Sequence, residues 1–228
     1  MFWFYDSTYI LVILAALISL IASAKVKSTY ARYSKMQSAR GITAEQAAQQ
    51  ILYGAGLPQV PVNRVAGDLT DHYDPRSQTL ALSQTVFGSS SVAAIGVAAH
   101  ECGHAIQDAE NYAPIRIRNA IVPVVNFGSK LSWPLLLLGL IMSFDPLVLA
   151  GIWMFGFVVA FQVITLPVEF NASRRAMRIL EERGILGSEE LKGARKVLSA
   201  AAMTYVAAAV GSLLQLARLL MIRNSRRR

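Results

Sequence analysis

Residues 100–104 read His-Glu-Cys-Gly-His. Two histidines four positions apart lie on the same face of a helix, one above the other. Both imidazoles can then bind one tetrahedral Zn²⁺, with Glu101 beside them to take a proton from a water molecule. The alternative is a pair of histidines that only make hydrogen bonds. The motif therefore predicts a metal site, provided that the surrounding sequence is helical.

The residues around this motif favour a buried helix. Ser89–Ser91 offer an N-cap, and residues 92–99 are apolar without a helix breaker. Residues 108–114, which include Asp108 and Pro114, mark the expected end of the helix. Cys102 is the single cysteine, and it points away from the histidine face. We interpret it as a small core residue.

The composition is that of a membrane protein. Hydrophobic residues make up 54% of the 228 residues, charged residues only 16%, and the mean hydropathy is +0.42. A first span is expected over about residues 8–24, preceded by aromatic residues at 2–5 and followed by Lys25 and Lys27. Because the positive charge follows the apolar stretch, we expect a retained span and not a cleaved signal peptide.

Two more apolar stretches, at about residues 121–143 and 147–168, predict a transmembrane hairpin that turns at Asp145 and Pro146. The earlier of the two is long enough only if it includes Lys130. The last apolar stretch, at about residues 197–222, has two interpretations. It is either a fourth span, which would place Arg226–Arg228 outside, or a helix that lies at the interface or against the core.

The distribution of charge predicts the orientation of the spans. Nine basic residues lie between positions 25 and 120 and seven between 169 and 198, with none before the first span or in the hairpin turn. Basic loops near spans stay in the cytoplasm. We therefore expect an N-terminus outside the cell membrane and His100 on the cytoplasmic side. Basic residues near the membrane are attracted to anionic lipid, which explains the net charge of +8. We therefore expect no nucleic-acid partner.

Residues 43–114 predict a small α+β core that carries the metal helix. Thr43 opens a capping box, and short β-prone runs follow it. Thr79–Ser83 alternates like a half-exposed strand, and an edge strand beside the metal could pair with a peptide backbone. The alternative is an ordinary hairpin that supports the helix. We treat residues 1–228 as one domain, with a charged helical segment at 169–196.

A catalytic zinc site takes three protein ligands and keeps one open position. His72 is the only other histidine, and it lies in a segment rich in turn residues. Among the carboxylates, Glu169 stands out because it directly follows the third apolar stretch. A helix that emerges from the membrane would hold this carboxylate rigidly.

Several of these segments together resemble a known family. They are residues 69–76 (LTDHYDPR) and 80–83 (LALS) before the motif, the motif itself, the apolar hairpin, and residues 166–170 (LPVEF) after it. This combination is similar to the YugP-like family of bacterial neutral zinc metallopeptidases, integral-membrane gluzincins related in pattern to HtpX-type proteases. The resemblance implies an α-helical membrane protein with a zincin-like core, one Zn²⁺ held by His100, His104 and Glu169, and Glu101 as general base.

Four further residues are candidates for supporting roles, namely His72, Ser173, Asp108 and Tyr205. Ser173 stands where the HtpX-type pattern has an aspartate, and it could still hydrogen-bond a ligand. Asp108, one turn beyond His104, could accept a hydrogen bond from a ligand imidazole or be a solvated charge. Tyr205 is a candidate donor to the oxyanion or a packing aromatic. Asn171 is expected to face away from Glu169.

The expected activity is that of a zinc-dependent membrane endopeptidase acting on peptides or membrane proteins. One rival is a membrane protein with a structural or regulatory zinc, in which His72 or Asp108 would complete the site. The other is a membrane-surface scaffold whose motif is accidental. The sequence indicates no oligomeric state.

Overall fold

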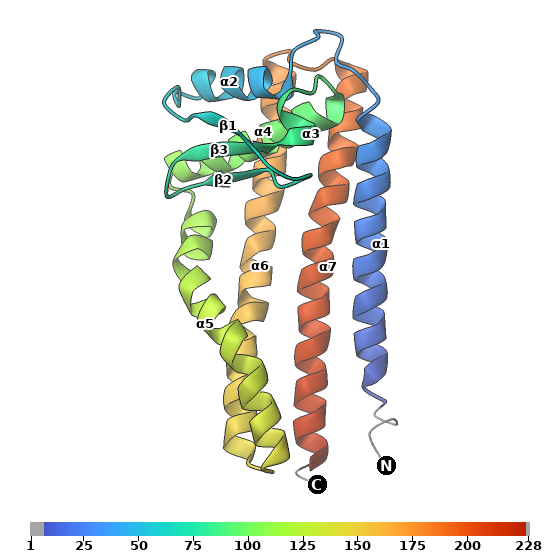
Figure 1. Ribbon diagram of the computed structural model, residues 1–228, viewed down its shortest axis with the longest axis vertical. Coiled ribbons are helices and arrows are strands. Elements are labelled where there is room, and N and C mark those ends of the chain that lie inside the picture. The colour runs from blue at the N-terminus through green and yellow to red at the C-terminus, as the bar shows by residue number, and fades with distance from the viewer. Residues whose placement is uncertain (1–6, 227–228) are drawn as a thin grey trace. The chain divides into compact units, whose positions relative to one another are not determined.

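The computed structural model describes residues 7–226 and is mainly helical, with one small sheet (Figure 1). The elements in chain order are α1 (Tyr9–Tyr33), α2 (Ala44–Gly54), β1 (Val62–Val65), β2 (His72–Asp74), β3 (Thr79–Ser83), α3 (Gln84–Phe87), α4 (Val92–Ala109), α5 (Ala113–Ile141), α6 (Asp145–Glu182) and α7 (Ser188–Arg226). This confirms the expected fold class. The aromatic residues 2–5, Arg227 and Arg228 lie outside the described residues. The predicted location of the N-terminus outside the cell membrane concerns these residues and stays a prediction.

The chain divides into two compact units, and the long helices contribute to both. The first unit contains residues up to 23, residues 117–166 and residues from 204 onward. The second contains residues 24–116 and 167–203, and therefore holds the sheet and α4. The helices do not end where the composition changes, since α1 continues from its apolar part to Tyr33 and α6 continues through Glu169.

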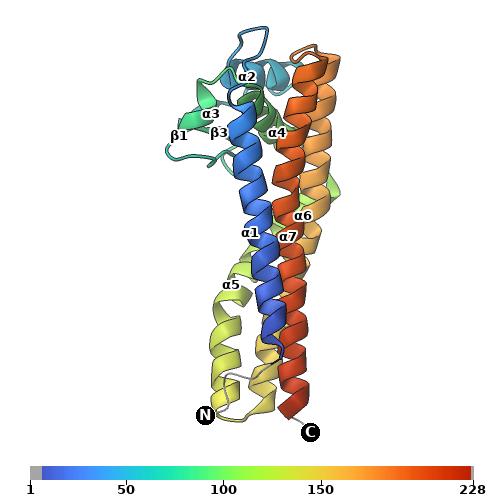
Figure 2. The ribbon, with the colours of Figure 1, turned by 90° about the vertical axis from the view of Figure 1, so that its right-hand side faces the viewer.

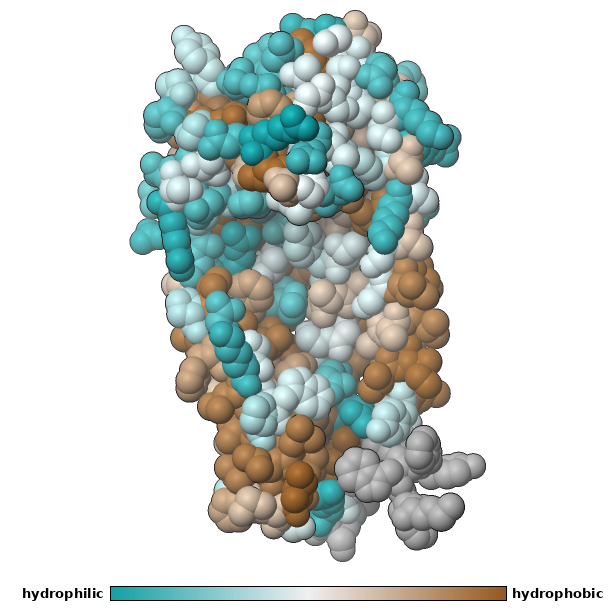
Figure 3. Space-filling view, in the orientation of Figure 1, coloured by the Kyte–Doolittle hydropathy of each residue, from teal (hydrophilic) through white to brown (hydrophobic). Residues whose placement is uncertain are grey.

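Helices α1, α5, α6 and α7 are each long and apolar enough to cross a membrane. Large apolar side chains on them are exposed, for example Ile21, Ile141 and Trp153, and hydrophobic residues gather over the α5–α6 hairpin (Figure 3). The two hairpin helices approach closely at small residues. The Ser132 hydroxyl donates to the carbonyl oxygen of Gly151 across the pair, at 3.1 Å. Such contacts are typical of helices packed in lipid.

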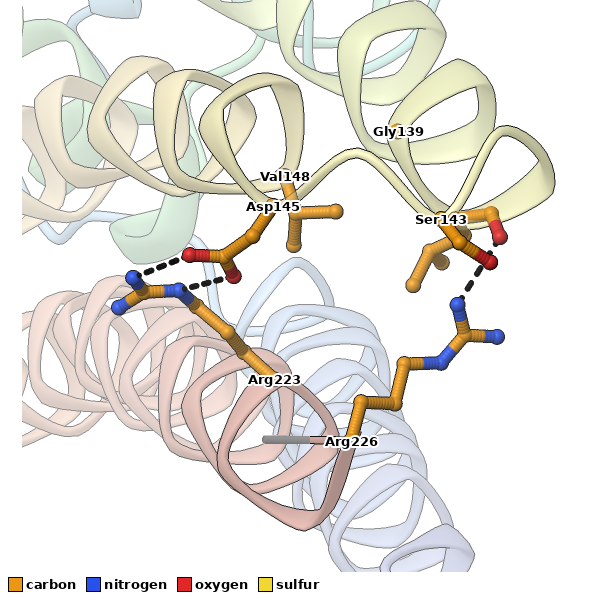
Figure 4. A pocket seen from close by; sticks show the side chains of 7 residues that line it. Gly139, Ser143, Asp145, Val148, Arg223 and Arg226 are labelled. Carbon is orange, nitrogen blue, oxygen red and sulfur yellow. Dashed lines mark hydrogen bonds and ion pairs between the residues drawn. The ribbon is translucent and has the colours of Figure 1, made fainter. Parts of the chain in front are cut away.

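Helix α7 packs along this hairpin within the first unit. Leu219 is buried against Leu136 and Ile152. At the turn, the Arg223 guanidinium binds the Asp145 carboxylate through two contacts of 2.8 Å, and Arg226 donates to the carbonyl oxygen of Leu140 (Figure 4). The last apolar segment is therefore packed against the other apolar helices, and α7 is long and apolar enough to be a fourth span. The choice between a fourth span and a helix at the interface stays a prediction.

In the second unit the strand order is β1-β3-β2, with β1 parallel and β2 antiparallel to β3. The strand at Thr79–Ser83 forms as expected. However, it is the central strand and not a half-exposed edge, and Leu80–Ser83 are all buried. Both neighbours pair with it, so its backbone cannot accept a further strand. The edge strand in contact with α4 is β2.

The local capping signals are confirmed. The Ser91 hydroxyl accepts from the backbone N–H of Ala94 at the start of α4, and Thr43 and Gln46 form the capping box of α2. Helix α4 is buried along most of its length and contacts α2 together with strands β2 and β3. It ends at Ala109, before Asn111 takes a positive φ of 54°. A rigid, buried helix thus carries the histidine motif.

Candidate metal centre

Helix α4 places His100 and His104 on one face. The two ring centroids are 4.7 Å apart and the ring planes are nearly perpendicular. His104 is buried and His100 is partly buried. The i, i+4 spacing therefore brings two imidazoles together, as the sequence predicts.

Glu169 reaches this pair from α6. Its Oε2 lies 3.2 Å from Nε2 of His100 and 3.6 Å from Nε2 of His104. Tetrahedral zinc bonds of about 2.0–2.1 Å put neighbouring ligand atoms about 3.3–3.4 Å apart. One metal-binding atom from each of the three residues lies within 4.8 Å of the others. The donor set and its spacing fit one Zn²⁺.

The close approach of α4 and α6 depends on Gly103. A Cβ at this position would lie 2.7 Å from the carbonyl oxygen of Ala172 and 3.1 Å from its Cα. Gly103 stands between the two histidines, and Ala172 stands between Glu169 and Ser173. The missing side chain therefore lets the turns that carry the two histidines and Glu169 touch backbone to backbone.

The far nitrogen of each histidine has its own partner. Ser173 Oγ lies 3.1 Å from Nδ1 of His100, a contact that the sequence suggested. Nδ1 of His104 donates to Oε1 of the fully buried Gln107, at 3.0 Å. With both Nδ1 atoms occupied, the Nε2 atoms of His100 and His104 face Glu169. Partners of this kind fix the tautomer and the ring orientation of metal-ligating histidines.

Gln107 is a functional candidate that the sequence reasoning missed. Its Nε2 donates to the carbonyl oxygen of Val168 and to Oδ1 of Asn171, both at 2.9 Å, so its oxygen must face His104. Asn171 Oδ1 also accepts from Arg175. The only available signal was the position of Gln107, three residues after His104 on the same helix.

Glu101 is buried next to His100. Burial raises the pKa of its carboxyl to about 7, and the neighbouring His100 opposes this rise. A backbone hydrogen bond from Tyr73 on β2 also reaches the carboxylate. A carboxyl group with a pKa near neutrality can both accept and return a proton at physiological pH.

Asp108 does not contact a histidine in the structure. Its Oδ2 accepts a hydrogen bond of 3.0 Å from the Tyr73 hydroxyl, and thereby fixes β2 against α4. Gln107 makes the contact to the imidazole of His104 instead, because α6 places Val168 and Asn171 opposite Gln107 whereas β2 places Tyr73 opposite Asp108.

Of the remaining candidates, His72 does not belong to the group that could hold a metal. His72 is exposed on β2 and its Nδ1 contacts the carbonyl oxygen of Thr70. Tyr205 lies on α7 in the first unit. Cys102 is buried and its thiol lies 3.7 Å from the carbonyl oxygen of Ala48, and burial raises its pKa well above the usual value. Within residues 7–226 the group that could hold a metal has three residues, so a tetrahedral ion there would have a fourth position open.

Comparison with known proteins shows the family of the chain. The chain matches, over residues 8–224, the model of a family described as "Putative neutral zinc metallopeptidase". It is 47% identical to "Putative membrane protease YugP" of Bacillus subtilis (strain 168) over 215 residues, which cover 94% of this chain and 96% of the relative. No solved structure matches. The chain belongs to this family of neutral zinc metallopeptidases.

Proposed function

We propose that this protein is a membrane endopeptidase that hydrolyses peptide bonds with one zinc ion, of the gluzincin type. The observation that carries the proposal is the convergence of two Nε2 lone pairs and one carboxylate oxygen within 4.8 Å, beside the buried Glu101. Three ligands from the described residues leave room for a reacting group. A closed structural site would need a fourth ligand, and neither His72 nor Asp108 belongs to the group.

The residues of the site have distinct proposed roles. His100, His104 and Glu169 would hold Zn²⁺, which supplies Lewis-acid polarisation of a carbonyl group and of water. Glu101 accepts the proton of the attacking water and returns it to the leaving amine. Gln107 and Ser173 hold the imidazoles in the orientation that presents Nε2. Tyr205 stays a candidate donor to the oxyanion.

Strand β2 is the part of the sheet suited to position a peptide. It is an edge strand, it contacts α4, and Tyr73 hydrogen-bonds Glu101 from it. An extended peptide can add to such an edge through backbone hydrogen bonds. This arrangement supports a role of β2, in place of Thr79–Ser83, in aligning the scissile bond.

We also propose that the protein is a multi-pass protein of the cell membrane with the metal centre on the cytoplasmic side. Four helices that can span a bilayer support this, as does the concentration of basic residues at positions 25–120 and 169–198. Substrates would then be peptides or membrane proteins near the bilayer, and the charge requires no nucleic acid.

Glu101→Gln tests the proposal most directly. The amide cannot accept a proton but keeps the shape, so we expect full zinc content and a loss of peptidase activity of about 10²–10⁴-fold. Glu182→Gln, at an exposed position at the end of α6, is the matched control and should leave both unchanged. Unchanged turnover in Glu101→Gln would refute the mechanism. A wild-type protein without stoichiometric metal would favour the scaffold alternative.

A further inference from the structure

A basic groove lies between α1 and α7 in the second unit, apart from the metal centre. The two helices run side by side in both ribbon views (Figures 1 and 2). The groove has a volume of about 760 Å³. Its polar lining comes from residues at helical spacing on each helix, namely Lys25, Ser28, Thr29, Arg32 and Tyr33 on α1 and Lys192, Arg195, Lys196 and Ser199 on α7.

The groove carries uncompensated positive charge. Five of its lining residues are cations and none is a carboxylate. Lys192 pairs with Glu189, and Arg32 lies over the Tyr33 ring. Lys25, Arg195 and Lys196 are exposed, and none of the three has an ion pair within residues 7–226. Three neighbouring free cations attract an anion.

The walls of the groove are held together by close packing. A Cβ on Gly193 would lie 2.8 Å from the Tyr33 ring and 3.1 Å from Val92, so α7 touches α1 and the start of α4 here. The groove is therefore formed before any ligand arrives, which lowers the cost of binding.

The groove continues into an apolar slot of about 390 Å³, with which it shares Arg195, Ser199 and Met203. The rest of the slot is lined by four apolar residues, Phe170, Met177, Leu198 and Ala202, and by Ser173 and Arg174. A cationic mouth joined to an apolar slot matches an amphiphile with an anionic head and a hydrocarbon chain.

The place of the groove along both helices fits a lipid. Lys25 directly follows the apolar part of α1, and Lys196 directly precedes the last apolar stretch of α7 at about residues 197–222. With those parts in the bilayer, the groove lies at the level of the headgroups. We propose that it binds one anionic phospholipid, with the phosphate among Lys25, Arg195 and Lys196 and an acyl chain in the slot. This proposal does not depend on the peptidase activity.

The experiment uses full-length protein, delipidated in a non-ionic detergent and titrated with phosphatidylglycerol under native mass spectrometry. The groove variant is Lys25→Gln/Arg195→Gln/Lys196→Gln. The matched control, Lys27→Gln/Lys35→Gln/Arg64→Gln, removes the same charge from exposed positions outside the groove. Lys27 is two residues from Lys25 and on another side of α1. Each cation near an anionic headgroup raises the affinity about fivefold. The groove variant loses three cations, so it should bind phosphatidylglycerol on the order of 100-fold more weakly.

The wild-type protein and the control variant should each retain one phosphatidylglycerol and much less phosphatidylcholine. Lys25→Arg/Lys196→Arg keeps the charges and should bind like the wild type, which separates charge from folding. Equal binding by the groove and control variants would overturn the proposal, as would equal binding of both lipids. Displacement of the lipid by equimolar inorganic phosphate or glycerol 3-phosphate would overturn the role of the slot and assign the groove to a free phosphate.

Discussion

Replacing Gly103 by alanine should separate the metal ligands without changing any of them. The new Cβ would lie 2.7 Å from the Ala172 carbonyl oxygen, whereas ordinary contact begins at about 3.4 Å. Helices α4 and α6 must therefore move apart by about 0.7 Å between the His100–His104 pair and Glu169. Metal sites require ligand distances within about 0.2 Å of the ideal values. We expect zinc affinity to fall by about 10- to 100-fold, the range seen when the support of metal ligands is disturbed.

The assay is zinc competition against a chromophoric chelator, with thermal unfolding of the metal-free protein measured in parallel. Overpacking should lower the free energy of unfolding by about 1–3 kcal/mol, partly offset by the gain of about 1 kcal/mol from removing a helical glycine. Gly96→Ala is the control on the same helix. Its Cβ would meet Ala194 at 3.4 Å, an ordinary contact, so zinc affinity should not change. Wild-type zinc affinity in Gly103→Ala would refute the argument that this glycine sets the ligand distance.

Three other changes test the remaining parts of the site. Glu169→Gln should abolish stoichiometric zinc binding, measured by elemental analysis, and a fully loaded variant would remove Glu169 from the ligand set. Gln107→Leu leaves Nδ1 of His104 without an acceptor, so the zinc dissociation constant should rise by about 10- to 100-fold, and an unchanged constant would show that this hydrogen bond does not support the ligand. Tyr73→Phe removes the hydrogen bond to Asp108 and should cost about 1 kcal/mol in chemical denaturation with zinc retained. Loss of zinc in that variant would mean that β2 supports the metal centre itself.

The features that the sequence predicted depend on neighbours along the chain. The spacing of His100 and His104, the caps at Thr43 and Ser91, and the apolar length of the spans follow from helix geometry and composition alone. Glu169 was a candidate because it follows an apolar stretch, and its selection over His72 needed the family resemblance. Thr79–Ser83 was recognised as a strand, but alternation cannot tell a central strand from an edge when the partner strands are short and irregular.

The tertiary structure decided which distant residues meet. Gln107 and Asp108 are adjacent polar residues near the end of α4, yet they have different partners. Gln107 hydrogen-bonds His104 and faces α6, whereas Asp108 accepts from Tyr73 of β2. The backbone contact at Gly103 and the charged groove between α1 and α7 likewise require two segments far apart in sequence. Local periodicity fixes which way a side chain points from its own helix. Its partner is set by the packing of helices, which no short pattern in a single sequence encodes.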